Sequence, residues 1–129
     1  MNFKKRNLEV GGLETIKAQF EILDYAYTND EMISMLTESV KDGSIPLIDD
    51  YKAENIEAIY NRTTGEKFMN ERTREEMLDK RNSNWVNQIP ELMKNKSTFI
   101  AVGAAHLAGE QVVINLLKKA GYKVKSVMK

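Results

Sequence analysis

The sequence predicts an α/β fold, a helix-rich domain that carries a small, mostly parallel sheet. Two observations support this prediction. Residues 99–102 form a short continuous apolar run before Gly103, as expected of a buried parallel strand. Residues 122–127 alternate between apolar and polar side chains, as a half-buried strand does. With the helical stretch between them, residues 98–127 are expected to form a strand, a turn, a helix and a final strand.

The N-terminal elements follow from glycines, apolar spacing and capping residues. Residues 8–13 are predicted to be a brief strand or an extended lead-in, broken by paired glycines. Residues 15–27 repeat apolar side chains at spacings of three and four, which predicts an amphipathic helix. Residues 28–31 have the capping-box pattern and are expected to open a second helix, which residues 42–44 end.

Three further helices are predicted after these. One follows Pro46, and a long one covers residues 66–95, bent or broken near Pro90. The last covers residues 110–120, with Gly121 as its C-cap. The predicted helices thus accompany only two or three strands. A parallel sheet that small rarely has enough covered surface on its own. We therefore expect either further strands from elsewhere or a second copy of the chain in a homo-oligomer.

The composition fits one soluble domain over residues 1–129. Formal net charge is zero and the isoelectric point is about 6.6, so no basic field would gather nucleic acid or an anionic membrane. The absence of cysteine excludes disulfides, thiolate chemistry and iron–sulfur clusters. No apolar stretch predicts a signal peptide or a transmembrane span, and the compartment stays open.

The most informative side chain is that of His106, the only histidine. It follows the predicted strand and the turn at Gly103, where open α/β sheets collect their chemistry. An imidazole there can be a metal ligand or a proton carrier. It can equally be an inert core histidine, and the small neighbours Ala104 and Ala105 suit either interpretation.

Arg81 and Glu14 are the other candidates. Arg81 borders a predicted inward stripe on the long helix, so its guanidinium either reaches solvent with its stem on Trp85 or holds an anionic group. Glu14 lies where an extended segment meets a helix, and the helix dipole alone could explain it. Other acids at predicted helix starts are interpreted as structural: Asp49, Asp50 and Glu110. The stripe beside Arg81 consists of Leu78, Asn82, Trp85 and Ile89.

These residues together resemble the TraB/GumN family, which includes the Tiki Wnt-cleaving proteins. The resemblance runs through Gly12-Leu13-Glu14-Thr15, Arg81-Asn82 with Trp85, residues 99–110 and residues 116–124. It implies an erythromycin-esterase/ChaN-like architecture and a metal-dependent hydrolase site with two G-x-x-H motifs. By this resemblance Gly103 and His106 are the second motif, Glu14 is the family's glutamate and Arg81 its arginine.

The first G-x-x-H motif is absent, because there is no second histidine. The chain is therefore expected to be the C-terminal half of such a protein, a portion of a peptidase-like hydrolase that is inactive or nearly so alone. His106 would be a metal ligand, Glu14 a ligand or general base, and Arg81 a stabiliser of negative charge. A divalent ion such as Mn²⁺ would be the cofactor, not bound tightly by this chain alone.

Two alternatives stay open. The chain could be a non-catalytic module that binds a peptide or a small ligand such as haem in the same cleft. It could also be a stand-alone helical domain in which His106 is structural. Relatives are often exported or membrane-tethered, but the sequence names neither the substrate nor the compartment.

Overall fold

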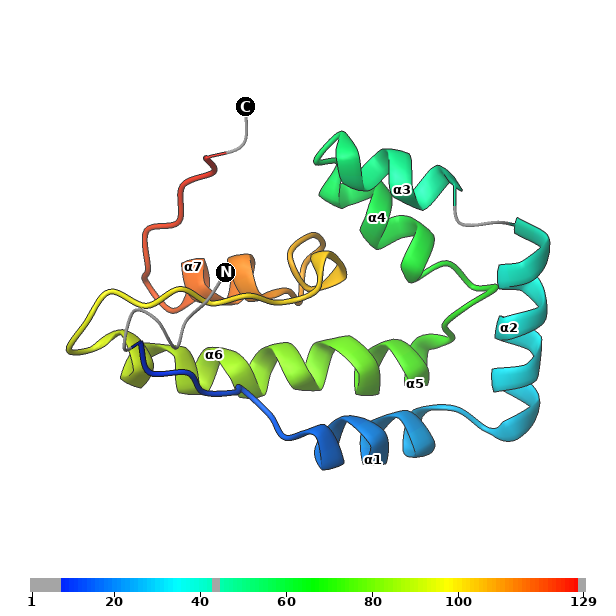
Figure 1. Cartoon of the computed structure of the whole chain (residues 1–129), viewed down its shortest axis with the longest axis horizontal. Coiled ribbons are helices and arrows are strands. Elements are labelled where there is room, and N and C mark those ends of the chain that lie inside the picture. Colours follow the sequence, from blue (N-terminus) through cyan, green and yellow to red (C-terminus); the bar gives the residue numbers. More distant parts are fainter. Residues whose placement is uncertain (1–7, 43–44, 128–129) are drawn as a thin grey trace.

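The computed structural model describes residues 8–42 and 45–127, and within these ranges all regular structure is helical (Figure 1). Gly43 and Ser44, predicted to end the second helix, lie outside the described residues. The elements in order are α1 (Ile16–Ala26), α2 (Asn29–Asp42), α3 (Ile45–Lys52), α4 (Ile56–Thr63), α5 (Glu71–Arg74), a π-helical turn η2 (Glu75–Asp79), α6 (Lys80–Met93), a 3₁₀ turn η3 (Ala104–His106) and α7 (Val113–Lys119).

The prediction of an α/β fold with a parallel sheet is wrong for the described residues, which contain no strand. Residues 99–102 and 122–127 lie outside the helices, and neither segment is a strand in the part of the chain that the structure describes. A strand is defined by its backbone ladder, so an apolar pattern alone does not make one. In the first segment Ile100 and Val102 pack against the hydrophobic core, whereas Phe99 is 83% exposed. The apolar run therefore reflects packing of a single segment against helices.

The predicted long helix is present with shorter bounds. Helix α5, the turn η2 and helix α6 follow one another without a gap, from Glu71 to Met93 (Figure 1). Pro90 does not break the helix, which continues for three more residues. The π-helical turn has a wider winding and ends at Asp79, two residues before Arg81, and such turns occur often near functional sites.

The hydrophobic core lies between α6 and α7. Trp85, Val86 and Ile89 of α6 meet Val113 of α7, and all four are at most 9% exposed. Leucines from both ends of the chain and the apolar residues of the extended segment complete this cluster: Leu13, Ile100, Val102, Leu116 and Leu117. The core thus joins the extended lead-in before α1 to the C-terminal helix.

The predicted C-cap of the last helix is confirmed. Gly121 has a φ of 91°, a conformation that L side chains rarely adopt. Its N–H donates to the Lys118 carbonyl at 3.0 Å, and the Tyr122 N–H donates to the Leu117 carbonyl at 3.0 Å. This pair of bonds is the Schellman motif, which satisfies carbonyls at the end of α7.

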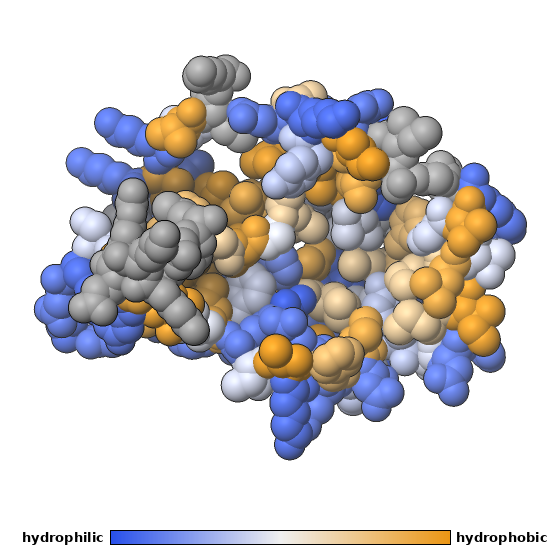
Figure 2. All heavy atoms as spheres, in the orientation of Figure 1, coloured by the Kyte–Doolittle hydropathy of each residue, from blue (hydrophilic) through white to orange (hydrophobic). Residues whose placement is uncertain are grey.

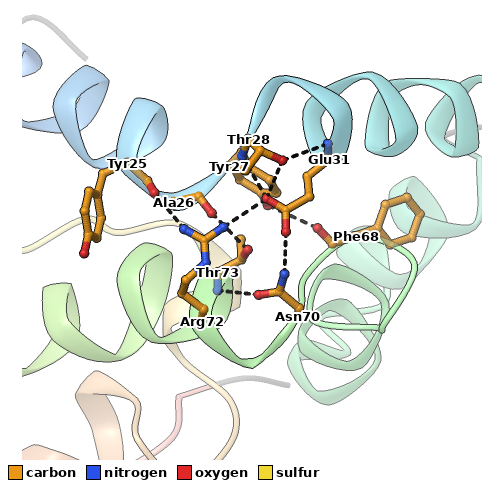
Figure 3. A network of polar contacts seen from close by, with 9 residues as sticks. All are labelled: Tyr25, Ala26, Tyr27, Thr28, Glu31, Phe68, Asn70, Arg72 and Thr73. Carbon is orange, nitrogen blue, oxygen red and sulfur yellow. Dashed lines mark hydrogen bonds and ion pairs between the residues drawn. The ribbon is translucent and has the colours of Figure 1, made fainter.

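The predicted capping box is also present, and it belongs to a larger network (Figure 3). The Thr28 N–H donates to the Glu31 carboxylate at 2.8 Å, and the Glu31 N–H donates to Thr28 Oγ1 at 3.3 Å. The same carboxylate accepts from Asn70 at 2.7 Å and from Arg72 at 2.9 Å, and Arg72 also donates to the Tyr25 carbonyl at 2.9 Å. These contacts fasten the α1–α2 corner to the start of α5.

The single helix predicted after Pro46 is two helices, α3 and α4. The chain turns between them at Glu54, which has a φ of 55°. Helix α4 ends at Thr63, which is followed by the C-cap Thr64.

Several apolar side chains of α1 and α2 lie at the surface, and Figure 2 shows apolar surface over the α2 side of the molecule. None of the helices in the described ranges has the length and hydropathy needed to cross a membrane. The exposed apolar residues of the two helices are Ile16, Phe20, Tyr25, Ile33, Leu36 and Val40.

Candidate functional site

His106 closes the turn η3, directly after the extended segment. Its N–H donates to the Gly103 carbonyl at 2.9 Å, which forms the turn, and the residue is only 7% exposed. Gly103 has φ −61° and ψ 145°, values open to most residues. The expected glycine-dependent bend at Gly103 is therefore not observed. A Cβ at this position would lie 3.6 Å from His106 Cδ2, an ordinary contact distance.

Two neighbours on α6 hold the imidazole. His106 Nδ1 lies 2.6 Å from the side-chain oxygen of Asn82, and its ring centroid lies 4.5 Å from that of Trp85. Burial, and to a smaller extent the Arg81 charge, lower the pKa of His106 from 6.5 to about 4, while the Glu14 charge acts in the opposite direction. At neutral pH the imidazole is therefore uncharged.

Arg81 holds a carboxylate, one of the two interpretations left open by its sequence position. Its Nε donates to one oxygen of Glu14 at 3.2 Å, and its Nη2 donates to the other. The two side chains are only 15% and 13% exposed. The Nη1 donates to the Met77 carbonyl at 2.9 Å, and the guanidinium carbon lies 5.0 Å from the centre of the Trp85 ring. This position allows a cation–π contact.

Trp85 therefore links the predicted site residues in space. It contacts both Arg81 and His106, and Arg81 holds Glu14, so positions far apart in the chain meet around one indole ring. The buried indole N–H has no hydrogen-bond acceptor among the described residues.

Sequence reasoning missed Asn82 and Trp85 as site residues, because both were assigned to an inward stripe. Asn82 is fully buried, and its Nδ2 donates to the Gln111 carbonyl at 2.8 Å. An amide on an apolar helix face was the signal that could have found it, since a buried amide needs polar partners.

A pocket of about 370 Å³ adjoins this cluster. Arg81 and His106 line it, whereas most of its wall is apolar and includes two methionines, which adapt to irregular shapes. The remaining lining residues are Leu47, Tyr51, Ile59, Thr63, Met69, Met77, Leu78, Gly103, Ala104 and Ala105. Glu14 is not among the residues that line the pocket.

The donor set for a metal ion is incomplete. Within residues 8–42 and 45–127 no group of three or more histidine, aspartate and glutamate side chains is placed to hold a metal ion. Of the acids interpreted as structural, Asp50 pairs with Arg62 at 2.6 Å and Glu110 is exposed. His106 is thus the nitrogen donor of the site, and both oxygens of Glu14 already accept from Arg81.

Comparison with known proteins identifies the family. The model of the TraB/PrgY/gumN family matches residues 1–126, nearly the whole chain. Neither a curated protein nor a solved structure matches. The family match covers the extended lead-in with Glu14, the helix with Arg81 and the turn with His106, so the chain belongs to the TraB/PrgY/gumN family.

Proposed function

We propose that this chain contributes part of a metal-dependent hydrolase centre. His106 is its metal ligand or proton acceptor, and Arg81 is the cation that stabilises developing negative charge. The observation that carries the proposal is the position of a neutral imidazole beside a partly buried arginine, both on the wall of an apolar pocket. Perturbed groups that gather in a pocket are typical of functional sites.

The chemistry of the donors supports a single metal ligand from this chain. A histidine that binds a metal usually makes a hydrogen bond through its other ring nitrogen, as His106 Nδ1 does to Asn82. Both oxygens of Glu14 accept from Arg81, and Glu14 is not among the residues that line the pocket, so we assign it chiefly to holding the guanidinium. A complete centre needs further ligands from outside the described residues. A divalent ion bound there would polarise the scissile carbonyl and activate water.

The part of Arg81 follows from its hydrogen bonds. Glu14 accepts from Nε and Nη2, and the Met77 carbonyl accepts from Nη1, which fixes the plane of the guanidinium. Each terminal nitrogen carries a second hydrogen that can donate to an anionic oxygen in the pocket. A preorganised cation in a site with little water stabilises the negative charge that develops on a substrate carbonyl.

The pocket favours a substrate with an apolar group. Its wall consists mostly of aliphatic, methionine and alanine side chains, which offer few polar contacts to a charged group. The charge of Arg81 is already balanced by Glu14. A peptide or small molecule that places an apolar side chain there would bring a neighbouring carbonyl towards His106 and Arg81.

The second candidate function is a non-catalytic module that binds such a peptide or small ligand in the pocket. The incomplete donor set favours it. The two functions differ in whether His106 is needed to bind a divalent ion.

The single histidine makes a direct test possible. Mn²⁺ is added to uniformly ¹⁵N-labelled chain, and paramagnetic broadening of the imidazole and backbone amide signals is followed. We expect weak binding that broadens the His106 signals first, and we expect His106→Gln to abolish the local broadening of nearby amide signals. Glu110→Gln, which changes an exposed acid outside the site, is the matched control and should behave as the wild type.

Two results would contradict the hydrolase proposal. The first is Mn²⁺ broadening that is the same in His106→Gln as in the wild type. The second is the absence of local broadening at any Mn²⁺ concentration, combined with apolar peptide binding that His106→Gln leaves intact, which would favour the binding module. We also expect the purified chain to hydrolyse peptides very slowly or not at all, because one imidazole does not complete the centre.

A further inference from the structure

We propose that Asn82 is a positioning residue for His106, and that its side-chain oxygen selects the imidazole tautomer with an unprotonated Nε2. The proposal rests on the proposed function, because it concerns the same site. It is carried by the two hydrogen bonds of the Asn82 amide, one to His106 Nδ1 at 2.6 Å and one to the Gln111 carbonyl at 2.8 Å.

The Gln111 carbonyl fixes the orientation of the amide. A carbonyl oxygen only accepts hydrogen bonds, so the Asn82 group that faces it must be the NH₂ group. The other group, Oδ1, then faces the imidazole and can only accept. Of the two neutral tautomers of His106, only the one with hydrogen on Nδ1 can donate to it. The lone pair of the ring is consequently on Nε2.

The edge of the ring that carries Nε2 lies beside a residue of the pocket wall. Gly103 and His106 both line the pocket, and the edge of the ring nearest to Gly103 is Cδ2, the atom bonded to Nε2. An unprotonated Nε2 at this edge can accept a proton or bind a metal ion. A protonated Nε2 can do neither.

Burial strengthens the selection. Asn82 is 0% exposed and the imidazole 7%, so little water competes for the ring nitrogens. A buried amide oxygen without a donor is costly, which penalises the other tautomer. In water a free imidazole favours the tautomer with hydrogen on Nε2, so the contact with Asn82 reverses the intrinsic preference of the ring.

A structural role for Asn82 is the alternative, since its bond to Gln111 ties α6 to the loop before α7. Stability measurements alone would not separate the two roles. The tautomer of His106 does separate the two roles. A hydrogen bond that only connects the helix to the loop would not determine which imidazole nitrogen carries the proton.

The experiment is ¹H–¹⁵N correlation NMR of the histidine-labelled chain at about pH 7.5, where the imidazole is neutral. The wild type is expected to show a protonated Nδ1 and an unprotonated Nε2. Asn82→Leu removes the acceptor at similar size and is expected to move most of the population to the tautomer with hydrogen on Nε2. Asn82→Asp keeps the acceptor but loses the donor to the Gln111 carbonyl, and it is expected to keep hydrogen on Nδ1. Asn87→Leu, at an exposed position of the same helix, is the matched control.

The wild-type spectrum tests the proposal even if Asn82→Leu does not fold. A wild-type imidazole with hydrogen on Nε2 would overturn it. So would a folded Asn82→Leu chain that keeps the wild-type tautomer.

Metal binding separates this inference from the proposed function. Asn82→Leu is expected to weaken Mn²⁺ binding by about 10-fold or more, the usual range for such a partner of a ligating histidine. If the tautomers change as described while the wild type binds no divalent ion, the assignment of Asn82 stands and the hydrolase proposal fails.

Discussion

The burial of His106 predicts how the stability of the chain depends on pH. Burial lowers the pKa of the folded-state imidazole from 6.5 to about 4, whereas unfolding restores the ordinary value. Between these two values the unfolded state binds more protons than the folded state, so the free energy of unfolding rises with pH. The contribution of the neutral imidazole is fully present above about pH 6.5 and is lost as the pH falls through 4.

The size of the effect follows from the change in pKa. A fall from 6.5 to about 4 corresponds to about 3 kcal/mol of unfolding free energy, at about 1.4 kcal/mol for each pKa unit. The wild type is compared with His106→Gln, in which the side chain does not titrate. The carboxylates contribute equally to the pH dependence of both unfolding free energies, so their contributions cancel in the difference. Urea unfolding from about pH 7.5 down to about pH 4 gives both free energies by linear extrapolation. The wild type is expected to lose about 3 kcal/mol relative to the variant over this range.

Fluorescence gives an independent reading of the same protonation. Trp85 is the only tryptophan, and its ring lies against the imidazole of the only histidine. A protonated imidazole quenches a neighbouring indole, so the emission of the folded chain should fall with a midpoint near pH 4. A midpoint near 6.5, with a constant difference in unfolding free energy between the two chains, would refute the reasoning, because the imidazole would then be hydrated.

Four further variants test the packing around the site. Gly109→Ala should lower the free energy of unfolding by about 2 kcal/mol or more in urea, since φ is 103° and the new Cβ would lie 2.7 Å from the Tyr60 ring. Gly103→Ala should change it by less than about 0.5 kcal/mol yet weaken Mn²⁺ binding in the NMR titration. Ile89→Ala, at a residue 1% exposed, should cost about 3 kcal/mol in thermal unfolding. Arg72→Ala should speed hydrogen exchange at the α1–α2 corner more than in α7. An equal increase across the chain would contradict the role of Arg72 in holding this corner to the start of α5.

The features of the fold that the sequence predicted correctly are local. The helix predicted from residue 15 is α1, and Thr15 is its N-cap, whose hydroxyl accepts from the Ala18 N–H at 3.1 Å. The capping box at Thr28 and the C-cap at Gly121 were likewise predicted from the sequence and are present. In each case the residues that satisfy the helix end lie within a few positions of it, so the sequence alone contains the whole interaction.

The predicted strands are wrong because a strand, unlike a helix cap, depends on a partner that is distant in sequence. Residues 99–102 have the apolar run of a buried strand, but a strand also requires a neighbour whose position the run does not specify. The described residues supply helices instead, and α6 and α7 bury Ile100 and Val102 as a sheet would have buried them. In this segment the apolar run therefore predicted two side chains that face the core, Ile100 and Val102, but not the backbone pairing.

For the site, the sequence predicted Glu14, Arg81 and His106, and the structure brings them together around Trp85. Their catalytic roles stay predictions. The two neighbours that orient the imidazole were missed because a two-class pattern of polar and apolar positions treats Asn82 and Trp85 as core. Only the hydrogen bond from His106 to Asn82, across 24 positions of sequence, shows what the amide does.

The two glycines that flank His106 differ in what they require of the fold. Gly109 has a positive φ and lies against the Tyr60 ring, so packing alone explains its lack of a side chain. Gly103 has an ordinary φ and leaves room for a Cβ at normal contact distance, so neither backbone conformation nor packing demands a glycine there. What a Cβ at Gly103 would occupy is space beside the Cδ2 edge of the imidazole, on the pocket wall. Folding therefore does not account for a glycine at this position of the G-x-x-H motif, so we expect its replacement to leave stability unchanged and to alter binding at the pocket wall.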